Sequence, residues 1–346
     1  MKKYLFMAMA AVAITSCSQD EVMEVAEKQA INFGNTFVEN ATRAAIDGSY
    51  TNAKGNLASF QVYGTTKDNA GASAVNIFNG VTVSGTSSDG KYTTPWNYEE
   101  KYTQYWIGGY YYKFVAIADG NVDGVTKVLL DNVNMPISIE ILDATKQKDV
   151  LLDFTTEAEE STITKPVPFV FKHILSKAKF TAKVDANIDS KYYYTVSNIK
   201  INSAAKANVF TLGETLGTWG TATSTYNVEF GNIVETASES ETPAASALYT
   251  GSSLESNWDR LLIPETVTNI TFDIKLYTNN GEANAENKEI ETYSKTINPN
   301  ISMQAGHAYN FVINLKKPGE PIQFTVTEVS EWVTEGNEKE IYSGNN

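Results

Sequence analysis

The chain has 346 residues, a formal net charge of −14 and a sequence pI near 4.7, and charged residues make up only 20% of it. This acidity argues against nucleic acid as a partner, because its phosphates would be repelled. A single cysteine excludes an intramolecular disulfide, so stability must come from buried apolar area, which a chain of this length can supply.

Residues 1–16 have the pattern of a lipoprotein signal peptide. Lys2 and Lys3 precede an apolar run, residues 4–14, that is too short to span a bilayer as a helix. Two small residues, the second of them Ser16, stand before Cys17, whose thiol is the nucleophile that accepts the lipid. We therefore predict cleavage between Ser16 and Cys17 and an outer-membrane lipoprotein acylated at Cys17. The alternative is an ordinary cleaved signal followed by a chance cysteine.

Residues 17–43 are predicted to form a lipidated tether that leads into a first strand. The polar and acidic residues 18–21 fit a signal for export to the cell surface, and they fit a solvated tether nearly as well. Ile31, Phe33 and Phe37 are the apolar positions of the strand-like run that follows. The small and polar residues 40–44 are typical of an exposed loop.

Alternation of apolar and polar residues, the pattern of half-buried strands, recurs through the rest of the chain. The run 169–184 loses its phase at Ile174 and Leu175, which predicts two strands rather than one. Turn-forming pairs such as Asp89-Gly90 separate the runs. We therefore predict an all-β, sandwich-like protein. The strand-like runs are 60–63, 112–117, 150–154, 169–184, 192–201, 270–276, 309–315 and 322–326.

One segment is a candidate linker between two domains. Residues 156–165 are acidic and rich in Thr and Ser, and they lie between two strongly apolar runs. This division gives an N-terminal β-sandwich domain, residues 44–155, and a C-terminal β-sandwich domain, residues 166–346, with one or more terminal strands.

A series of short motifs, in this order and spacing, resembles one known family. The motifs are Thr-Arg-Ala at 42–44, Phe-x-Val-Tyr at 60–63, Tyr-x-Phe-x-Ala at 112–116, Phe-x-Phe-x-His-x-Leu-Ser-Lys at 169–177, Ala-Gly-His-Ala-Tyr at 305–309 and Val-Ser-Glu-Trp at 329–332. Together they resemble the fimbrillin-like proteins of type V pili, made by Gram-negative anaerobes. The resemblance covers nearly the whole chain.

The resemblance implies two transthyretin-like β-sandwich domains in tandem and a structural, adhesive role in a fimbria. It also implies that an arginine-specific protease cuts the surface lipoprotein in its first loop. Loss of the first strand then opens a groove that a strand from a neighbouring subunit fills. The matching bond is Arg43-Ala44, and the removable strand carries Ile31, Phe33 and Phe37. The alternative is that Arg43 is simply an exposed loop residue.

The resemblance places the donated strand in the C-terminal region. The candidate residues for it are Ile322, Phe324, Val326, Val329 and Trp332. Residues 338–342 are polar for a groove-filling strand, which departs from the pattern of a stalk subunit and suits a tip or accessory subunit. The implied partners are other fimbrial subunits, identical or accessory, and the outer membrane through lipid on Cys17.

An aromatic-rich segment, residues 96–112, is the one feature suited to binding carbohydrate, because exposed rings stack on sugar faces. Trp96, Tyr98, Tyr105 and Trp106 are the candidates to contact a host or bacterial surface glycan or protein. β-Sandwich cores use Tyr and Trp equally heavily, so core packing is the alternative. The second hypothesis for function is a tethered lipoprotein of the same fold that binds such a ligand without polymerising.

No enzymatic site is predicted. His173 and His307 lie far apart in the sequence and no second cysteine accompanies them, which argues against a zinc site. The sequence has no Gly-x-Ser-x-Gly motif, and its carboxylate clusters at 99–100 and 157–160 are typical of solvated loops. We therefore expect no catalytic residues, no metal and no cofactor.

Overall fold

The computed structural model describes residues 29–38, 57–88, 91–118, 125–127, 136–141, 149–189, 191–213, 217–233, 248, 253–256, 259–278, 288–329 and 338–345. These residues form strands and two short 3-10 turns, η1 (Glu100–Tyr102) and η2 (Glu160–Thr162), without any α-helix. The all-β prediction is therefore confirmed. Within these ranges no helix is long and apolar enough to cross a membrane.

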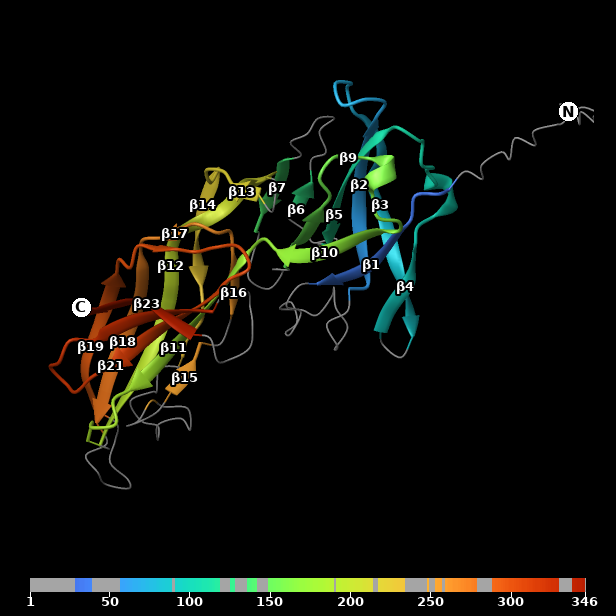
Figure 1. Ribbon diagram of the computed structural model, residues 1–346. Coiled ribbons are helices and arrows are strands. Elements are labelled where there is room, and N and C mark those ends of the chain that lie inside the picture. The colour runs from blue at the N-terminus through green and yellow to red at the C-terminus, as the bar shows by residue number, and fades with distance from the viewer. Residues whose placement is uncertain are drawn as a thin grey trace, which may run out of the picture.

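The first sheet has eight strands in the order β2-β3-β4-β1-β10-β8-β5-β9 (Figure 1). β2 also pairs with β5, so every strand of this sheet except β9 belongs to a closed ring. β1 lies in this ring between β4 and β10. The strands are β1 (Phe33–Val38), β2 (Ser59–Lys67), β3 (Val75–Ser88), β4 (Lys91–Asn97), β5 (Tyr111–Ala118), β8 (Leu151–Phe154), β9 (Ala158–Glu159) and β10 (Val167–His173).

Two further sheets pack face to face as a β-sandwich. One has the order β15-β11-β21-β22-β23, with β16 also on β11, and the other has the order β19-β18-β12-β7-β6, with β13 and β14 on β12. Their strands, with the small pair β17–β20, are β6 (Val125–Lys127), β7 (Pro136–Glu140), β11 (Ser176–Val184), β12 (Tyr192–Leu212), β13 (Gly217–Trp219), β14 (Ser224–Glu229), β15 (Ser253–Glu255), β16 (Arg260–Leu262), β17 (Thr266–Val267), β18 (Ile270–Thr278), β19 (Lys288–Ile297), β20 (Ile301–Ser302), β21 (Ala308–Leu315), β22 (Gln323–Val329) and β23 (Glu338–Asn345).

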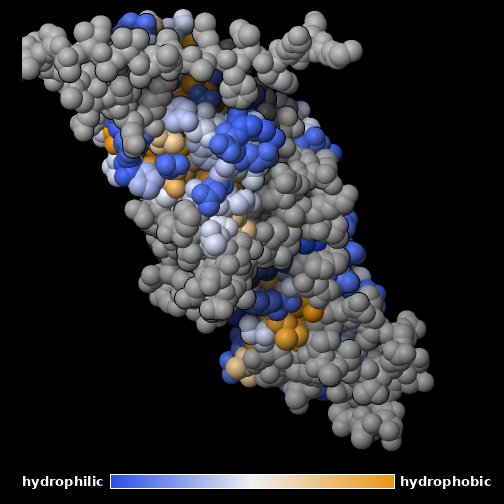
Figure 2. All heavy atoms as spheres, turned by 90° about the vertical axis from the view of Figure 1, so that its right-hand side faces the viewer, coloured by the Kyte–Doolittle hydropathy of each residue, from blue (hydrophilic) through white to orange (hydrophobic). Residues whose placement is uncertain are grey.

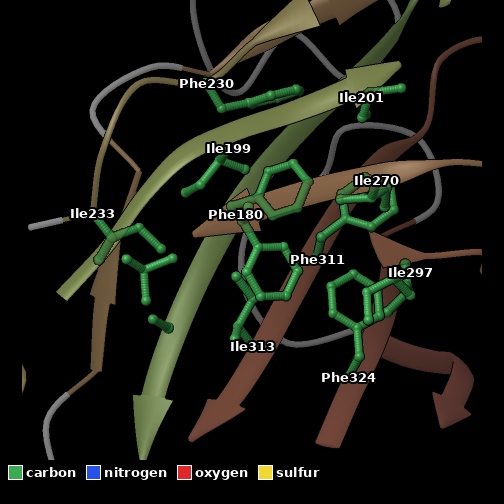
Figure 3. Close-up of a cluster of buried hydrophobic side chains, with 14 of the residues drawn as sticks. Phe180, Ile199, Ile201, Phe230, Ile233, Ile270, Ile297, Phe311, Ile313 and Phe324 are labelled. Carbon is green, nitrogen blue, oxygen red and sulfur yellow. The ribbon is translucent and has the colours of Figure 1, made fainter. Parts of the chain in front are cut away.

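Aromatic and branched aliphatic side chains from both sheets fill the sandwich (Figure 3). The Phe180 ring lies 4.7 Å from that of Phe230 and 5.0 Å from that of Phe311, measured between ring centroids. β18 buries every second residue from Ile270 to Leu276, as its strict alternation predicts. The predicted break at Ile174 and Leu175 is also confirmed, since β10 ends before these residues and β11 begins after them.

β12 joins the sandwich to the first sheet. This strand has 21 residues; its first half pairs with β18, and its last residues pair with β7. A hydrophobic cluster at this junction combines Val115 and Leu152 of the first sheet with Ile139 of β7 and Phe210 of β12. The two halves of the molecule therefore share a buried core, and Figure 1 shows them end to end along an elongated body.

The segment predicted as a linker, residues 156–165, contains β9 and η2. β9 pairs with β5, and the following strand, β10, returns to the first sheet beside β1. The chain leaves the first sheet once for β6 and β7, returns with β8, and leaves it for the last time at Ile174 and Leu175, between β10 and β11.

The described surface agrees with the acidic, polar composition. Figure 2 shows the face that lies at the right in Figure 1, where most of the coloured residues are hydrophilic. Hydrophobic residues on this face gather only in small, separate patches. Large exposed hydrophobic side chains in the described ranges include Val75, Tyr102, Tyr105, Ile107 and Ile290.

Candidate functional site

The candidate site is the place that β1 occupies in the first sheet. β1 runs parallel to β10, with Phe33 opposite Val167 and Val38 opposite Phe171. On its other side β1 meets β4 through one residue pair, Phe33 and Trp96. In the ring of paired strands, β1 is thus the link between β4 and β10. Its removal would leave two strand edges with unpaired backbone groups.

Phe33 of β1 is buried in the core of the first sheet, with 2% of its surface exposed. Its ring centroid lies 5.5 Å from that of Phe78, 5.8 Å from those of Phe114 and Phe169, and 6.0 Å from that of Tyr98. Edge-to-face and stacked rings at such distances add stability beyond the area that they bury. Loss of β1 would therefore expose an aromatic pocket as well as two strand edges.

The residues before β1 are held by the loop between β4 and β5. The backbone N–H of Ile31 donates to Gln104 O at 2.8 Å, and that of Trp106 donates to Gln29 O at 3.0 Å. The Tyr98 hydroxyl donates to Ile31 O at 2.6 Å. Burial raises the pKa of Tyr98, and a hydrogen bond with the Gln104 backbone opposes this shift. Ile31 itself is completely buried.

Gly34 is a point of close approach between β1 and Pro166. A Cβ atom on Gly34 would lie 2.7 Å from Cγ of Pro166 and 3.2 Å from its Cβ. Just beyond it the register of β1 against β10 shifts by one residue, between Gly34 and Phe37. A glycine inside a strand indicates such a close approach or a bulge. Gly34 was therefore a signal for this site in the sequence, which the alternation of apolar and polar residues alone did not reveal.

The four aromatic residues predicted to contact a ligand differ in their exposure. Trp96 is 5% exposed and Trp106 is 9% exposed, and both pack in the core of the first sheet. Tyr98 is half-buried with its hydroxyl bonded to Ile31. Tyr105 is 46% exposed, and Tyr102, which belongs to the same aromatic-rich segment but not to the four candidates, is 40% exposed. The exposed aromatic surface in this segment is therefore on the loop that holds residues 29–31.

The residues predicted to donate a strand lie mainly inside the sandwich. Ile322, Phe324 and Val326 are at most 3% exposed, and Phe324 packs against Phe272 and Phe311. Val329 ends β22, which lies between β21 and β23. Among the described strands, β23 pairs with β22 alone. Trp332 lies outside the described residues.

The residues predicted for maturation, Ser16, Cys17, Arg43 and Ala44, also lie outside the described part of the chain. The chain has one other arginine, Arg260 of β16. Arg260 is 5% exposed, its Nε donates to Glu229 O at 2.7 Å, and its backbone pairs with Ala178 of β11. An arginine-specific protease therefore cannot reach this residue in the folded sandwich.

Some titratable side chains of the described ranges are buried and interact in pairs. No group of three or more His, Cys, Asp or Glu side chains in these ranges could hold a metal ion. His173 Nδ1 pairs with the carboxylate of Asp149, and both side chains are almost fully buried. Burial lowers the pKa of Lys113, and the charge of Glu157 opposes this effect.

The fold and its sequence have known relatives. The model of the fimbrillin-like family matches residues 42–332. The chain belongs to the fimbrillin-like family. A comparison with curated proteins gave no match. Membership of this family supports a role as a fimbrial structural protein at the cell surface, associated with other fimbrial subunits, rather than an enzyme.

Several solved structures are similar to this fimbrillin-like chain, and the first of those that follow shares its fold. A fimbrial protein from Bacteroides vulgatus is 16% identical, with a TM-score of 0.63, over 87% of this chain and 99% of that one. A protein from Bacteroides ovatus to which a role in cell adhesion has been ascribed is 16% identical, over 89% and 99% of the two chains, with a TM-score of 0.48. A fimbrial assembly protein from Parabacteroides distasonis is 10% identical, over 92% and 100%, with a TM-score of 0.41.

Proposed function

We propose that this fimbrillin-like chain is a fimbrial subunit whose first strand is a removable plug. The subunit is exported as a lipoprotein through Cys17, cut after Arg43 and assembled when a strand from a neighbouring subunit takes the place of β1. The observation that carries the proposal is the position of β1 between β4 and β10 in a closed ring. Its place has the two features that an incoming strand needs, backbone edges for pairing and an aromatic pocket for side chains.

The scarcity of arginine supports a specific cut. Arg43 and Arg260 are the two arginines of the chain, and Arg260 is buried in β16. A cut after Arg43 would separate residues 1–43, which carry the acylated Cys17 and β1 together. One reaction would thus free the subunit from the membrane and open its groove.

The test treats the purified full chain with an arginine-specific protease. We expect one cut, after Arg43, with the bond after Arg260 intact, followed by ladders on a denaturing gel loaded without boiling. Intact-mass measurement identifies the cut, and the Arg43→Lys variant is the matched control because it keeps the charge and removes the site. Cleavage that produces no species larger than the monomer would contradict assembly by strand exchange.

The exposure of Tyr102 and Tyr105 favours a second candidate function. A surface-tethered form of the same fold could present these rings to a glycan or protein without polymerising. This function predicts that surface-displayed protein keeps an intact, acylated Cys17, which mass spectrometry of membrane fractions detects. It also predicts that a Tyr102→Ala/Tyr105→Ala variant loses binding on a glycan array while its thermal unfolding stays unchanged.

A further inference from the structure

The contact between Gly34 and Pro166 restricts which strand fits the place of β1. A Cβ at this position would lie 2.7 Å from Pro166 Cγ, below the 3.0 Å that real Cβ atoms respect. The obstructing atom belongs to a proline ring, whose internal freedom is limited to a change of pucker, and Cβ of the same ring, at 3.2 Å, also lies close. The Gly34 position is itself paired with Pro168 of β10, so the strand cannot slide sideways without losing its pairing. A strand that replaces β1 in this register therefore fits without displacing Pro166 when it has glycine at this position.

Two more positions define what the site accepts. Ile31, three residues before Gly34, is completely buried, so an apolar residue is required there. Asn35 follows Gly34 where the register against β10 shifts, and asparagine is among the residues that best tolerate irregular backbone. The place of β1 is thus suited to the pattern apolar-x-x-Gly-Asn, read in the direction parallel to β10.

β23 carries this pattern. Its residues 341–345 read Ile-Tyr-Ser-Gly-Asn, against Ile-Asn-Phe-Gly-Asn in residues 31–35, with Ile, Gly and Asn in the same places and the same direction. β23 pairs with β22 alone among the described strands. We infer that Pro166 acts as a steric filter, and that it selects β23 of a second copy with Gly344 in the place of Gly34. This inference rests on the proposed function.

The same filter excludes the more apolar strand β22. If Ile322 and Phe324 took the places of Ile31 and Phe33, the β-branched Thr325 would face Pro166. Phe324 and Val326 are also fully buried in their own sandwich. Residues 228–232, Val-Glu-Phe-Gly-Asn, carry the pattern too, but there Phe230 is completely buried against Phe180. These two segments are committed to the core of the sandwich.

Ser343 would stand where Phe33 stands, so β23 fills the aromatic pocket less well than β1 does. The wild-type β1 therefore outcompetes β23 while it is attached, and exchange requires its removal. Replacing Ser343 by Phe should strengthen binding of β23, because the ring would regain the contacts that Phe33 makes with Phe78, Phe114 and Phe169.

The test measures how labelled peptides bind to the full chain after it has been cut at Arg43 and separated from residues 1–43. The peptides are residues 29–38 (β1), 338–345 (β23) and 322–329 (β22). A fourth peptide is the β23 sequence with Ser343→Gly/Gly344→Ser, which keeps the composition and moves the glycine by one place. We expect the β23 peptide to bind about tenfold or more tightly than both the swapped peptide and the β22 peptide. A β23 peptide with Ser343→Phe should bind more tightly still.

The outcomes separate this inference from the proposed function. If the β1 peptide binds, and the β23 and swapped peptides bind equally well, the result would support the groove left by β1 and overturn the steric filter at Pro166. Failure of the β1 peptide to bind would overturn the groove. In that case the steric filter is tested in the intact chain by hydrogen exchange. If Pro166 acts as a filter, Gly34→Val lowers the protection of the Ile31 amide about tenfold or more compared with Asn32→Val, a control at an exposed position. Equal protection in these two variants would refute it.

Discussion

Phe33 shows how much of this fold depends on single side chains. Its ring connects β1 to aromatic residues of β3, β5 and β10, through Phe78, Phe114 and Phe169. Its apolar character follows from the sequence, whereas its partners lie 45 or more positions away and could not be identified from local alternation.

We expect Phe33→Ala to lower the free energy of unfolding by about 3–5 kcal/mol, the usual loss when a buried phenylalanine is truncated and leaves a cavity. Denaturant titration followed by tryptophan fluorescence measures this loss, because Trp96 and Trp106 pack in the same core. Asn32→Ala, at an exposed neighbouring position, is the control and should change stability by less than about 0.5 kcal/mol. Equal stability of the two variants would contradict the burial of the Phe33 side chain in this core.

Glu265 provides a pH-dependent prediction at the junction of the two halves. Burial raises the pKa of its carboxyl, and the Ala205 N–H, which donates to Oε1 at 2.7 Å, opposes the shift. Because the folded-state pKa lies above the unfolded one, the folded chain binds more protons in this range. The contribution of Glu265 to stability is therefore complete below the unfolded pKa and is lost as pH rises through the folded pKa.

Glu265→Gln keeps an oxygen that accepts the Ala205 hydrogen bond and removes the charge. We expect this variant to be more stable than the wild type at neutral pH and equally stable at pH values below the unfolded pKa of the carboxyl. Thermal unfolding across a pH series measures the difference. A constant difference at all pH values would show that the titration of Glu265 does not contribute.

At the scale of elements, β1 is anchored at one end by a hydrogen-bonded loop and along its length by β10. Tyr98→Phe removes the hydroxyl that donates to Ile31 O and keeps the ring that packs against Phe33. We expect it to weaken the docking of residues 29–31 by about 0.5–1.5 kcal/mol, the net value of one hydrogen bond. The exchange rate of the Ile31 amide, measured by NMR or mass spectrometry, should rise accordingly.

Tyr63→Phe is a suitable comparison for this prediction. It makes the same chemical change on β2, where Tyr63 packs against the junction cluster and not against the core that contains Ile31. If both variants accelerate exchange at Ile31 equally, the effect would be general destabilisation rather than the loss of the bond from Tyr98.

The sequence predicted elements better than it predicted their pairing. Strict alternation located β18, and a phase break separated β10 from β11. The pairing of β2 with β5, which closes the ring, joins residues about 50 positions apart and leaves no local trace. Buried and exposed aromatic residues could not be told apart for a similar reason, since Trp96 and Tyr105 lie in one polar and aromatic segment and only the packing of distant strands separates them.

At the scale of the whole molecule, the shared cluster at the junction should make the two halves unfold together. Phe210 belongs to this cluster, is 1% exposed and packs its ring 5.1 Å from that of Trp219. We expect the wild type to show one cooperative thermal transition. Phe210→Ala should lower stability by about 3–5 kcal/mol and separate the transition into two.

Calorimetry distinguishes one transition from two. Lys206→Ala, on the same strand but only half-buried, is the control and should leave a single transition. A single transition in Phe210→Ala, shifted but undivided, would show that the coupling between the halves does not depend on this side chain.

The length of β12 has a mechanical consequence. A continuous strand of 21 residues ties the sandwich to β7, and β7 packs in the same cluster as the first sheet. A pull along the long axis of the molecule would be carried by this covalent chain and by ladders of hydrogen bonds loaded side by side, which must break together rather than one by one. A filament assembled from such subunits would therefore flex where one copy meets the next, and each subunit would stay stiff.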